Sequence, residues 1–452
     1  MCYRFKKDVP LKSHKKIIQL SNEWNFLSAA QQKEMISDRS GEGFKRPSLL
    51  RHWDKFDMVT GFCLDVMHQM DEGVSRFFIK EIVEGSSAVT LTKAQFKEID
   101  RKWLAIRVPG HENRTLRSLR FFKQMKAHEL RFFLQHGAPY VTKDIVPKKF
   151  HRILCLASVV AWTSTKDSVS VADIQNVEKW CTKFLAKFQE FFGVKYMKFS
   201  VHLMRHISLA LRQFGPLHLV SCYRPENEIG KIARRICGTN NTTKQIMNSF
   251  MALTQCSNFM DDIIAPESRK HPLVVKTAMQ VLGVPMPVFS FNAGTGTCRL
   301  LGKPEKLTNE EILQLINLQP TESSDIYAFQ KAKVEINIAI RTSSHSKNSV
   351  CNENFIQDSN LDCWRIIGIL GVLDREKTKV SRTLLFAEKL DKAGDGWKLD
   401  HVFTVVSTNK KQLFPTKLVM KQLVILQETI VPGTSEDRLL IVSPPSNIYL
   451  TT

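Results

Sequence analysis

An aspartate and a histidine one helical turn apart, Asp65 and His68, are the first residues in this sequence with the chemistry of a site. Side chains three positions apart on a helix lie on one face, so this carboxylate and imidazole could bind a divalent metal, order a water molecule or contact a phosphate. The same spacing fits a structural role, in which Asp65 caps the helix and His68 lies in its first turn. Both roles stay open at this point.

A second carboxylate, Glu226, follows Pro225 at a predicted helix start. A carboxylate that enters a helix from a fixed loop is a rigid metal ligand of the kind used in two-metal phosphoryl transfer. Alternatively, Glu226 only complements the positive end of the helix dipole. Gly230, one turn later, leaves space beside Glu226 for another backbone or for nucleic acid, although close helix packing would explain it equally well.

Basic residues outnumber acidic ones by 65 to 44, which gives a net charge of +21, and nearly all of this surplus lies in residues 1–320. A surplus of this kind favours contact with a polyanion, either nucleic acid or an anionic membrane surface, although a solvated basic surface is the alternative. The residues predicted to follow a DNA backbone are Lys123, Lys126, Arg131, Lys231, Arg234 and Arg235.

Several classes of protein are excluded by what the sequence lacks. None of its ten cysteines forms a C-x-x-C pair, which argues against a zinc knuckle or a disulfide scaffold and suits a reducing compartment. It has no phosphate-binding glycine loop and no G-x-S-x-G motif. Without a signal peptide or a run of eighteen apolar residues, we expect an intracellular protein with no membrane partner.

Two kinds of hydrophobic pattern position these residues. Helical spacing dominates residues 66–270, after a short extended stretch around 59–63; the predicted helices cover 66–82, 93–106, 114–136, 150–164, 170–193, 202–215 and 226–238. Ser170 and Asp173 have the spacing of a capping box, as do Thr308 and Glu311 at the start of a short helix over 308–318. Beyond a linker at 319–325, the alternation in KVEINIAIRT predicts a half-buried strand, and residues 326–452 a small all-β barrel or sandwich.

The order of three stretches resembles CACTA-type (En/Spm-like) cut-and-paste transposases and their relatives in host genomes. The first stretch holds Phe56-Asp57, Gly61, Asp65, Met67-His68 and Gly73-Val74, and the second is MKAHELRFFLQHGAPYV, residues 125–141. The third, residues 196–239, keeps His202, His206, Gly215-Pro216, Ser221, Glu226, Gly230 and Gly238-Thr239. The resemblance covers most of the chain.

This resemblance implies an RNase H-like transposase core of the DDE type, in which three carboxylates hold two Mg²⁺ ions that activate water or a 3′-hydroxyl. Glu226 matches the terminal glutamate of that family. Asp65 and His68 match its [C/D]-x-x-H motif, which lies downstream of the second catalytic aspartate. The span between Asp65 and Glu226 then corresponds to the long helical insertion of the family.

The family's two leading aspartates lie upstream of the region where this chain begins, so the resemblance predicts an N-terminally truncated or domesticated transposase without nuclease activity. The expected α+β architecture has four parts: a basic remnant of the core (1–55), the helical insertion and end of the core (56–300), a helix and linker (301–325) and an all-β accessory domain (326–452). We expect a nuclear protein that binds DNA or assembles with itself or with other nuclear proteins. The alternatives are an active Mg²⁺-dependent nuclease and a protein-interaction or chromatin-associated module.

Overall fold

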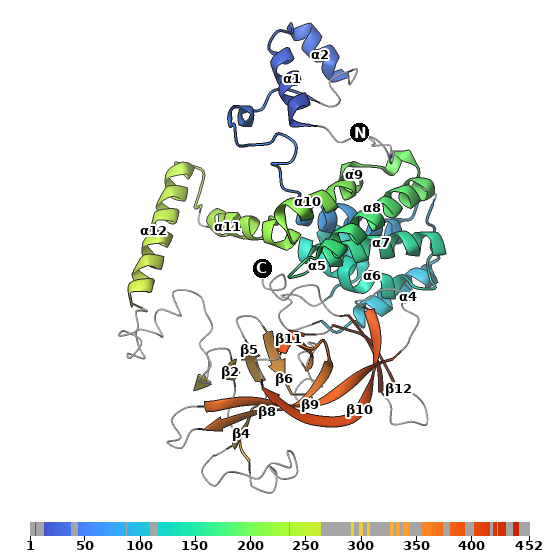
Figure 1. Cartoon of the computed structure of the whole chain (residues 1–452), viewed down its shortest axis with the longest axis vertical. Helices are drawn as coiled ribbons and strands as arrows, with labels where there is room; N and C mark the ends of the chain where they lie inside the picture. Colours follow the sequence, from blue (N-terminus) through green and yellow to red (C-terminus); the bar gives the residue numbers. More distant parts are fainter. Residues whose placement is uncertain are drawn as a thin grey trace. The chain divides into compact units, whose positions relative to one another are not determined.

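The computed structural model combines helices with antiparallel sheets (Figure 1), which confirms the α+β class. It forms two compact units, each treated separately below: Met1–Ile99 with Leu119–Ser221, and Asp100–Ser118 with Cys222–Thr452. The structure describes residues 5, 13–37, 44–86, 88–108, 116–234, 236–263, 291–292, 298–301, 305–307, 326–329, 331–334, 338–342, 354–373, 380–393, 402–415, 419–422, 424–430 and 437–442.

The first unit is built from helices. Those over its described residues are α1 His14–Trp24, α2 Ala29–Ser37, η1 Leu49–His52, η2 Met67–Ser75, α3 Arg76–Glu84, α4 Lys93–Leu104, whose end lies in the second unit, η3 Leu119–Gln124, α5 Ala127–Phe132, η4 Phe133–Gly137, α6 Ala138–Thr142, α7 Lys148–Ser164, α8 Val171–Phe192, η5 Val194–Tyr196, α9 Phe199–Leu203, η6 Met204–His206, α10 Ile207–Phe214 and η7 Leu217–Val220.

The longest helix of this unit, α8, begins and ends where the sequence predicts. The Ser170 hydroxyl accepts a hydrogen bond from the Asp173 backbone N–H while the Asp173 carboxylate accepts one from the Ser170 N–H, which is the predicted capping box. Gly193 ends the helix with φ of +84°, a backbone conformation that glycine adopts without a steric penalty. The apolar side of α8 packs on α7 through a phenylalanine cluster, in which Phe150 of α7 contacts Phe192 of α8 and the buried rings of Phe184 and Phe188 contact each other.

Three predictions for this unit are wrong in detail. The stretch at 59–63 forms turns rather than an extended segment. The predicted helix 114–136 is divided among η3, α5 and η4, and residues 109–115 lie outside the described part of the chain. The predicted helix 202–215 is divided among α9, η6 and α10, with a short 3₁₀ turn at Met204–His206. Hydrophobic spacing alone does not distinguish 3₁₀ and π-helical turns from a regular α-helix.

The second unit contains helices α11, Tyr223–Ala233, and α12, Thr242–Ile263, and two antiparallel sheets. Helix α11 begins three residues before the predicted helix 226–238 and ends before its predicted stop. The strands are β1 Phe291–Asn292, β2 Cys298–Leu301, β3 Glu305–Lys306, β4 Ile326–Phe329, β5 Lys331–Val334, β6 Ile338–Arg341, β7 Phe355–Asp358, β8 Cys363–Leu373, β9 Val380–Ala393, β10 Val402–Pro415, β11 Val419–Gln422, β12 Val424–Ile430 and β13 Asp437–Val442.

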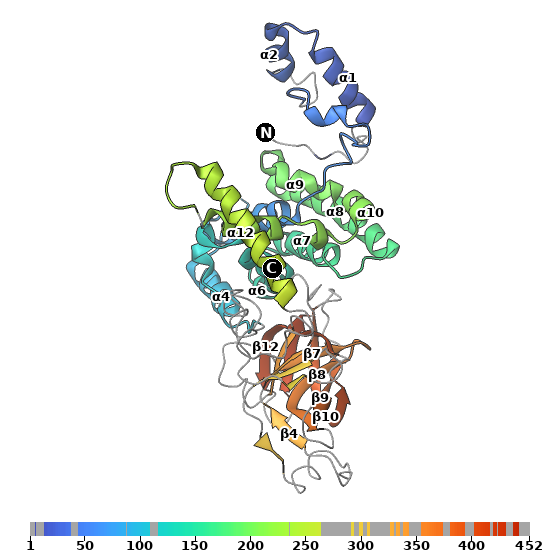
Figure 2. The same ribbon diagram turned by 90° about the vertical axis from the view of Figure 1, so that its left-hand side faces the viewer.

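The larger sheet has the strand order β11-β7-β8-β9-β10-β13-β12, with β3 and β4 attached through β8, and Figure 2 shows β7 to β10 in succession. The smaller sheet has the order β1-β2-β5-β6. Side chains of both sheets share one hydrophobic core, in which Leu300 and Ile340 of the smaller sheet join Trp364 and Leu385 of the larger. Two antiparallel sheets around one core agree with the predicted barrel or sandwich.

The boundaries of the β region differ from the prediction. Strand β2 pairs with β5, so the sheets already include residues before 326. The KVEINIAIRT stretch, predicted as one strand, forms β5 and β6, which pair antiparallel with Val334 opposite Ile338. An alternating sequence places its apolar residues on one face of a sheet both in one long strand and in two antiparallel strands. The alternation therefore does not show that the chain reverses direction between β5 and β6. The predicted helix 308–318 and linker 319–325 lie outside the described residues.

No helix in the described part of the chain is both long and apolar enough to span a bilayer.

Candidate functional site

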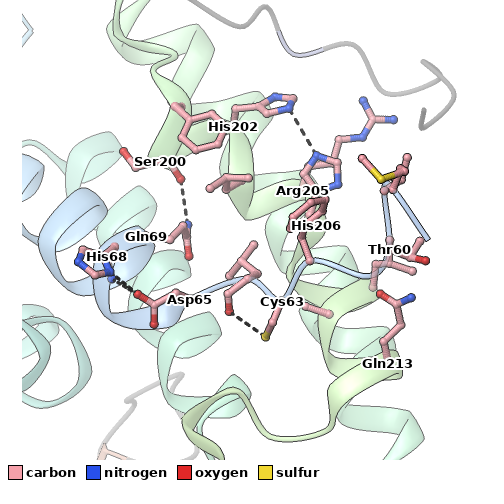
Figure 3. Close-up of a pocket in the computed structure, with 18 of the residues that line it drawn as sticks. Thr60, Cys63, Asp65, His68, Gln69, Ser200, His202, Arg205, His206 and Gln213 are labelled. Atoms are coloured by element: carbon pink, nitrogen blue, oxygen red, sulfur yellow. Dashed lines mark hydrogen bonds and ion pairs between the residues drawn. The ribbon is translucent and has the colours of Figure 1, made fainter. Parts of the chain in front are cut away.

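A pocket of about 740 Å³ lies in the first unit, where the segment before η2 meets helices α9, η6 and α10 (Figure 3). Its walls combine apolar side chains with a few polar ones. The polar and charged side chains that line it are Thr60, Cys63, Asp65, His68, Gln69, Ser200, His202, Arg205, His206 and Gln213. Apolar walls with a few convergent polar groups are typical of ligand sites.

The segment that forms one wall is held by a turn at Asp57. Its Oδ1 accepts hydrogen bonds from the backbone N–H groups of Thr60 and Val59, at 2.7 and 2.8 Å. These two hydrogen bonds, Thr60 first, hold the pKa of the Asp57 carboxyl below its usual range. The Asp57 carboxylate is therefore charged at neutral pH, and its hydrogen bonds hold the turn that leads the chain toward Asp65.

Asp65 and His68 lie together, as predicted, and Asp65 performs the structural role proposed for it. Its Oδ2 lies 2.5 Å from His68 Nδ1 and accepts from the His68 backbone N–H at 3.0 Å, while its Oδ1 accepts from Met67 N–H at 3.3 Å. The carboxylate thus caps the helical segment that begins at Val66 and continues as η2. The His68 side chain is 53% exposed and that of Asp65 19%, so the pair is open to the pocket.

Two contacts fix η2 against α9. The Gln69 side-chain amide donates a hydrogen bond to the Ser200 carbonyl at 2.9 Å, and a Cβ added at Gly73 would come 2.5 Å from the Ser200 Cβ. Gly73 therefore permits the close approach of the two helices. The π-helical geometry of η2 is a form that occurs frequently at functional sites.

Glu226, the predicted terminal carboxylate, is exposed in the first turn of α11 and belongs to the second unit. Among the described residues, a Cβ at Gly230 would meet only the Arg234 side chain, at 3.8 Å, which agrees with open space beside this glycine. The segment Tyr223–Ala233 holds no buried residue.

The predicted nucleic-acid contacts fall into different environments. Lys126 and Arg234 are exposed, and Arg235 lies outside the described residues. Lys123 is exposed but pairs with Glu84 at 2.9 Å, and Lys231 pairs with Glu228 at 2.7 Å. The prediction for Arg131 is wrong: this side chain is only 3% exposed because α5 and η4 run through the core of the unit.

A row of exposed lysines on α8 is the basic feature that the sequence prediction missed. Lys179, Lys183 and Lys187 follow one another at intervals of four residues on the side of the helix away from the phenylalanine cluster, and no ion pair of the described residues includes them. We call them the α8 lysine row. Intervals of four residues place the side chains about 6 Å apart along the axis. The four-residue spacing of these lysines is visible in the sequence. Only the structure shows that the opposite face of α8 is buried, so that the lysines lie on the surface.

Mg²⁺, the cation implied by the resemblance, is not suited to the residues gathered at this pocket. Mg²⁺ prefers oxygen ligands in octahedral geometry, and a pair of ions needs several carboxylates. Of the described residues that line the pocket, Asp65 is the only aspartate or glutamate. Its oxygens already accept three hydrogen bonds, and the nearby histidines offer nitrogen rather than oxygen.

No family model matches the chain, and comparison with curated proteins and with solved structures finds no significant match.

Proposed function

We propose that this chain is a CACTA-type transposase derivative that binds DNA and does not cleave it. The ordered motifs between Phe56 and Thr239 support the ancestry. Within this proposal the helices from η2 to α10 correspond to the helical insertion of an RNase H-like core, and the protein acts in the nucleus, alone or in complexes with itself or other proteins.

The observation that carries DNA binding is the α8 lysine row. Exposed lysines that are not neutralised by nearby carboxylates can contact phosphates, and each contact releases a condensed counterion from the DNA. Lys148, Lys149 and Arg152 are exposed at the start of α7. The 3.4 Å ion pair between Lys149 and Glu190 brings the start of α7 beside the end of α8, which supports a broader basic face.

The environment of Asp65 favours binding over cleavage. Two-metal strand cleavage places several carboxylates around both ions. The described residues of the pocket include one carboxylate, Asp65, and it caps a helix. If Asp65 bound a metal ion instead, the hydrogen bonds at the start of this helix would be lost. The alternative, an active nuclease, predicts Mg²⁺-dependent nicking of DNA that is lost when Glu226 is changed to Gln.

Titration of a labelled mixed-sequence duplex at several salt concentrations tests the proposal. A variant with all three lysines of the α8 lysine row changed to Gln should bind more weakly, and its slope of log affinity against log salt should be smaller by about 2–3, since each phosphate contact contributes about 0.9. The matched control changes Lys15, Lys16 and Lys33, which are exposed on α1 and α2, to Gln. Equal slopes for the two triple variants would contradict a role for the row, and absence of binding at low salt would reject DNA binding altogether.

A further inference from the structure

Two histidines on the α9–α10 side of the pocket face each other. His202, on α9, and His206, on η6, both line the pocket, and their Nε2 atoms lie 3.4 Å apart, with ring planes inclined by 66° (Figure 3). The intervals along the chain place both rings on the same side of the helical segment. The sequence showed this spacing, but it did not show which ring nitrogens would approach each other.

The separation of the two nitrogens agrees with that of two ligands on a tetrahedral zinc ion. Two imidazole nitrogens bound to a tetrahedral zinc ion, each at about 2.0–2.1 Å, are about 3.3–3.4 Å apart. Ligands at right angles, as in square-planar or octahedral sites, would be about 2.9 Å apart at the same bond length. At 3.4 Å, without an ion between them, the same two nitrogens form a long hydrogen bond whose direction depends on the tautomers of the two rings.

We propose that His202 and His206 form the protein side of a tetrahedral zinc site that opens into the pocket. Among the residues that the structure describes, no third His, Cys, Asp or Glu places a donor atom within 4.8 Å of both nitrogens. The two remaining positions therefore take water or an anionic ligand that enters the pocket. Catalytic zinc sites keep one such position open beside three protein ligands, so this site has one protein ligand fewer than those.

The charges around the pocket moderate the affinity for zinc and do not prevent binding. The Arg205 guanidinium lines the same pocket and opposes a dication, whereas the Asp65 carboxylate lines it and favours one. This site is separate from the Mg²⁺ chemistry that the resemblance implies, because imidazole nitrogen suits zinc and Mg²⁺ requires oxygen. The inference does not depend on DNA binding.

The test uses the full chain, stripped of metal by a chelator and titrated with Co²⁺, which absorbs strongly in the visible range when it is tetrahedral. We expect one saturable equivalent with tetrahedral bands and no thiolate-to-cobalt charge-transfer band, and we expect Zn²⁺ to displace it. Absence of saturable binding would overturn the proposal. So would a strong thiolate band, because it would assign the ion to a cysteine.

Variants then assign the ligands. His202→Gln and His206→Gln should each weaken Co²⁺ and Zn²⁺ binding by at least about tenfold, since loss of a group that merely orients a ligand already has such an effect. The matched control is His52→Gln, an exposed histidine outside the pocket, which should bind as the wild type does. Unchanged affinity in the double variant would refute the assignment. Circular dichroism establishes the folding of each variant, and the cobalt spectrum of the wild type tests the proposal independently of them.

Discussion

The carboxylate of Asp65 binds the side chain and the backbone of the same residue: its Oδ2 lies 2.5 Å from Nδ1 of His68 and 3.0 Å from the His68 backbone nitrogen. The same carboxylate oxygen therefore holds the His68 side chain, which is open to the pocket, and the first turn of the helix. A single residue therefore determines both where this helix begins and how the imidazole of His68 is oriented.

Replacing Asp65 should separate its capping role from its charge. Asp65→Ala removes every hydrogen bond of the cap and should lower the free energy of unfolding by about 1 kcal/mol. Asp65→Asn keeps an acceptor for the backbone N–H groups and should cost less, because asparagine is also a favourable cap. Urea denaturation of the two variants measures the difference. An Asn variant as unstable as the Ala variant would show that the contact of the carboxylate with the His68 side chain, and not the cap, dominates.

Two glycines of β8 provide a test of packing between the sheets. A Cβ added at Gly371 would lie 2.7 Å from Leu300 Cδ1 and 2.9 Å from Phe329 Cε2, so Gly371→Ala should destabilise the protein by about 1–3 kcal/mol through overpacking. At Gly368 the nearest atom is Phe386 Cβ at 3.5 Å, an ordinary contact. Gly368→Ala is thus the matched control, and thermal unfolding of both should rank Gly371→Ala as the less stable. The reverse order would contradict the described packing of the two sheets.

Cys155 should be unreactive despite its contact with a histidine. The Thr142 hydroxyl donates to the Ala138 carbonyl at 2.7 Å and so accepts from His151 Nδ1–H at 3.0 Å. That arrangement leaves His151 Nε2 to accept from the Cys155 thiol, at 3.4 Å. Burial raises the pKa of Cys155 to about 12, although Lys143 opposes the shift, and burial lowers the pKa of His151. The pair is therefore neutral rather than a thiolate with an imidazolium.

Alkylation of the folded protein at pH 8, followed by peptide mass spectrometry, checks this prediction. Cys155 should stay unmodified while the exposed Cys63 and Cys237 are alkylated, because the thiolate is the reactive form. Modification of Cys155 at the same rate as Cys63 would show an activated thiol and contradict the neutral pair.

The buried carboxylate of Glu388 should make the β region sensitive to acid. Glu388 is 3% exposed and accepts hydrogen bonds from Arg365, whose Nε lies at 2.8 Å, and from the Ser407 hydroxyl. Burial acts to raise the pKa of Glu388, but these hydrogen bonds and the charge of Arg365 outweigh it, so the pKa lies below its ordinary 4.5.

The sign of the pH effect follows from this lowered pKa. The stabilisation is complete above the pKa of the unfolded chain and is lost as the pH falls through the lower pKa of the folded protein. Between about pH 5 and pH 3 the free energy of unfolding should therefore decrease more in the wild type than in Glu388→Gln, which has no carboxylate to protonate. Urea titrations across this range measure it, and parallel curves for the two proteins would contradict the prediction.

Elements that depend on neighbouring residues could be predicted from the sequence. The capping box of Ser170 and Asp173 and the helix stop at Gly193 are local: their hydrogen bonds and backbone angles involve residues within one turn. The association of Asp65 with His68 is local for the same reason, and the buried side of α7 follows from its apolar composition. For these features the sequence alone determined the structure.

Features that depend on residues distant in the sequence required the tertiary structure. Arg131 reads as a surface cation, and its burial results from the packing of α5 and η4 inside the unit. The chain reverses between β5 and β6, and β5 also pairs with β2, whose residues Cys298–Leu301 lie far before it in the sequence. The 3.4 Å approach of His202 and His206 depends on the 3₁₀ turn at Met204–His206 and on the walls of the pocket. Burial and side-chain direction are properties of the whole packing, and no local pattern in the sequence contains them.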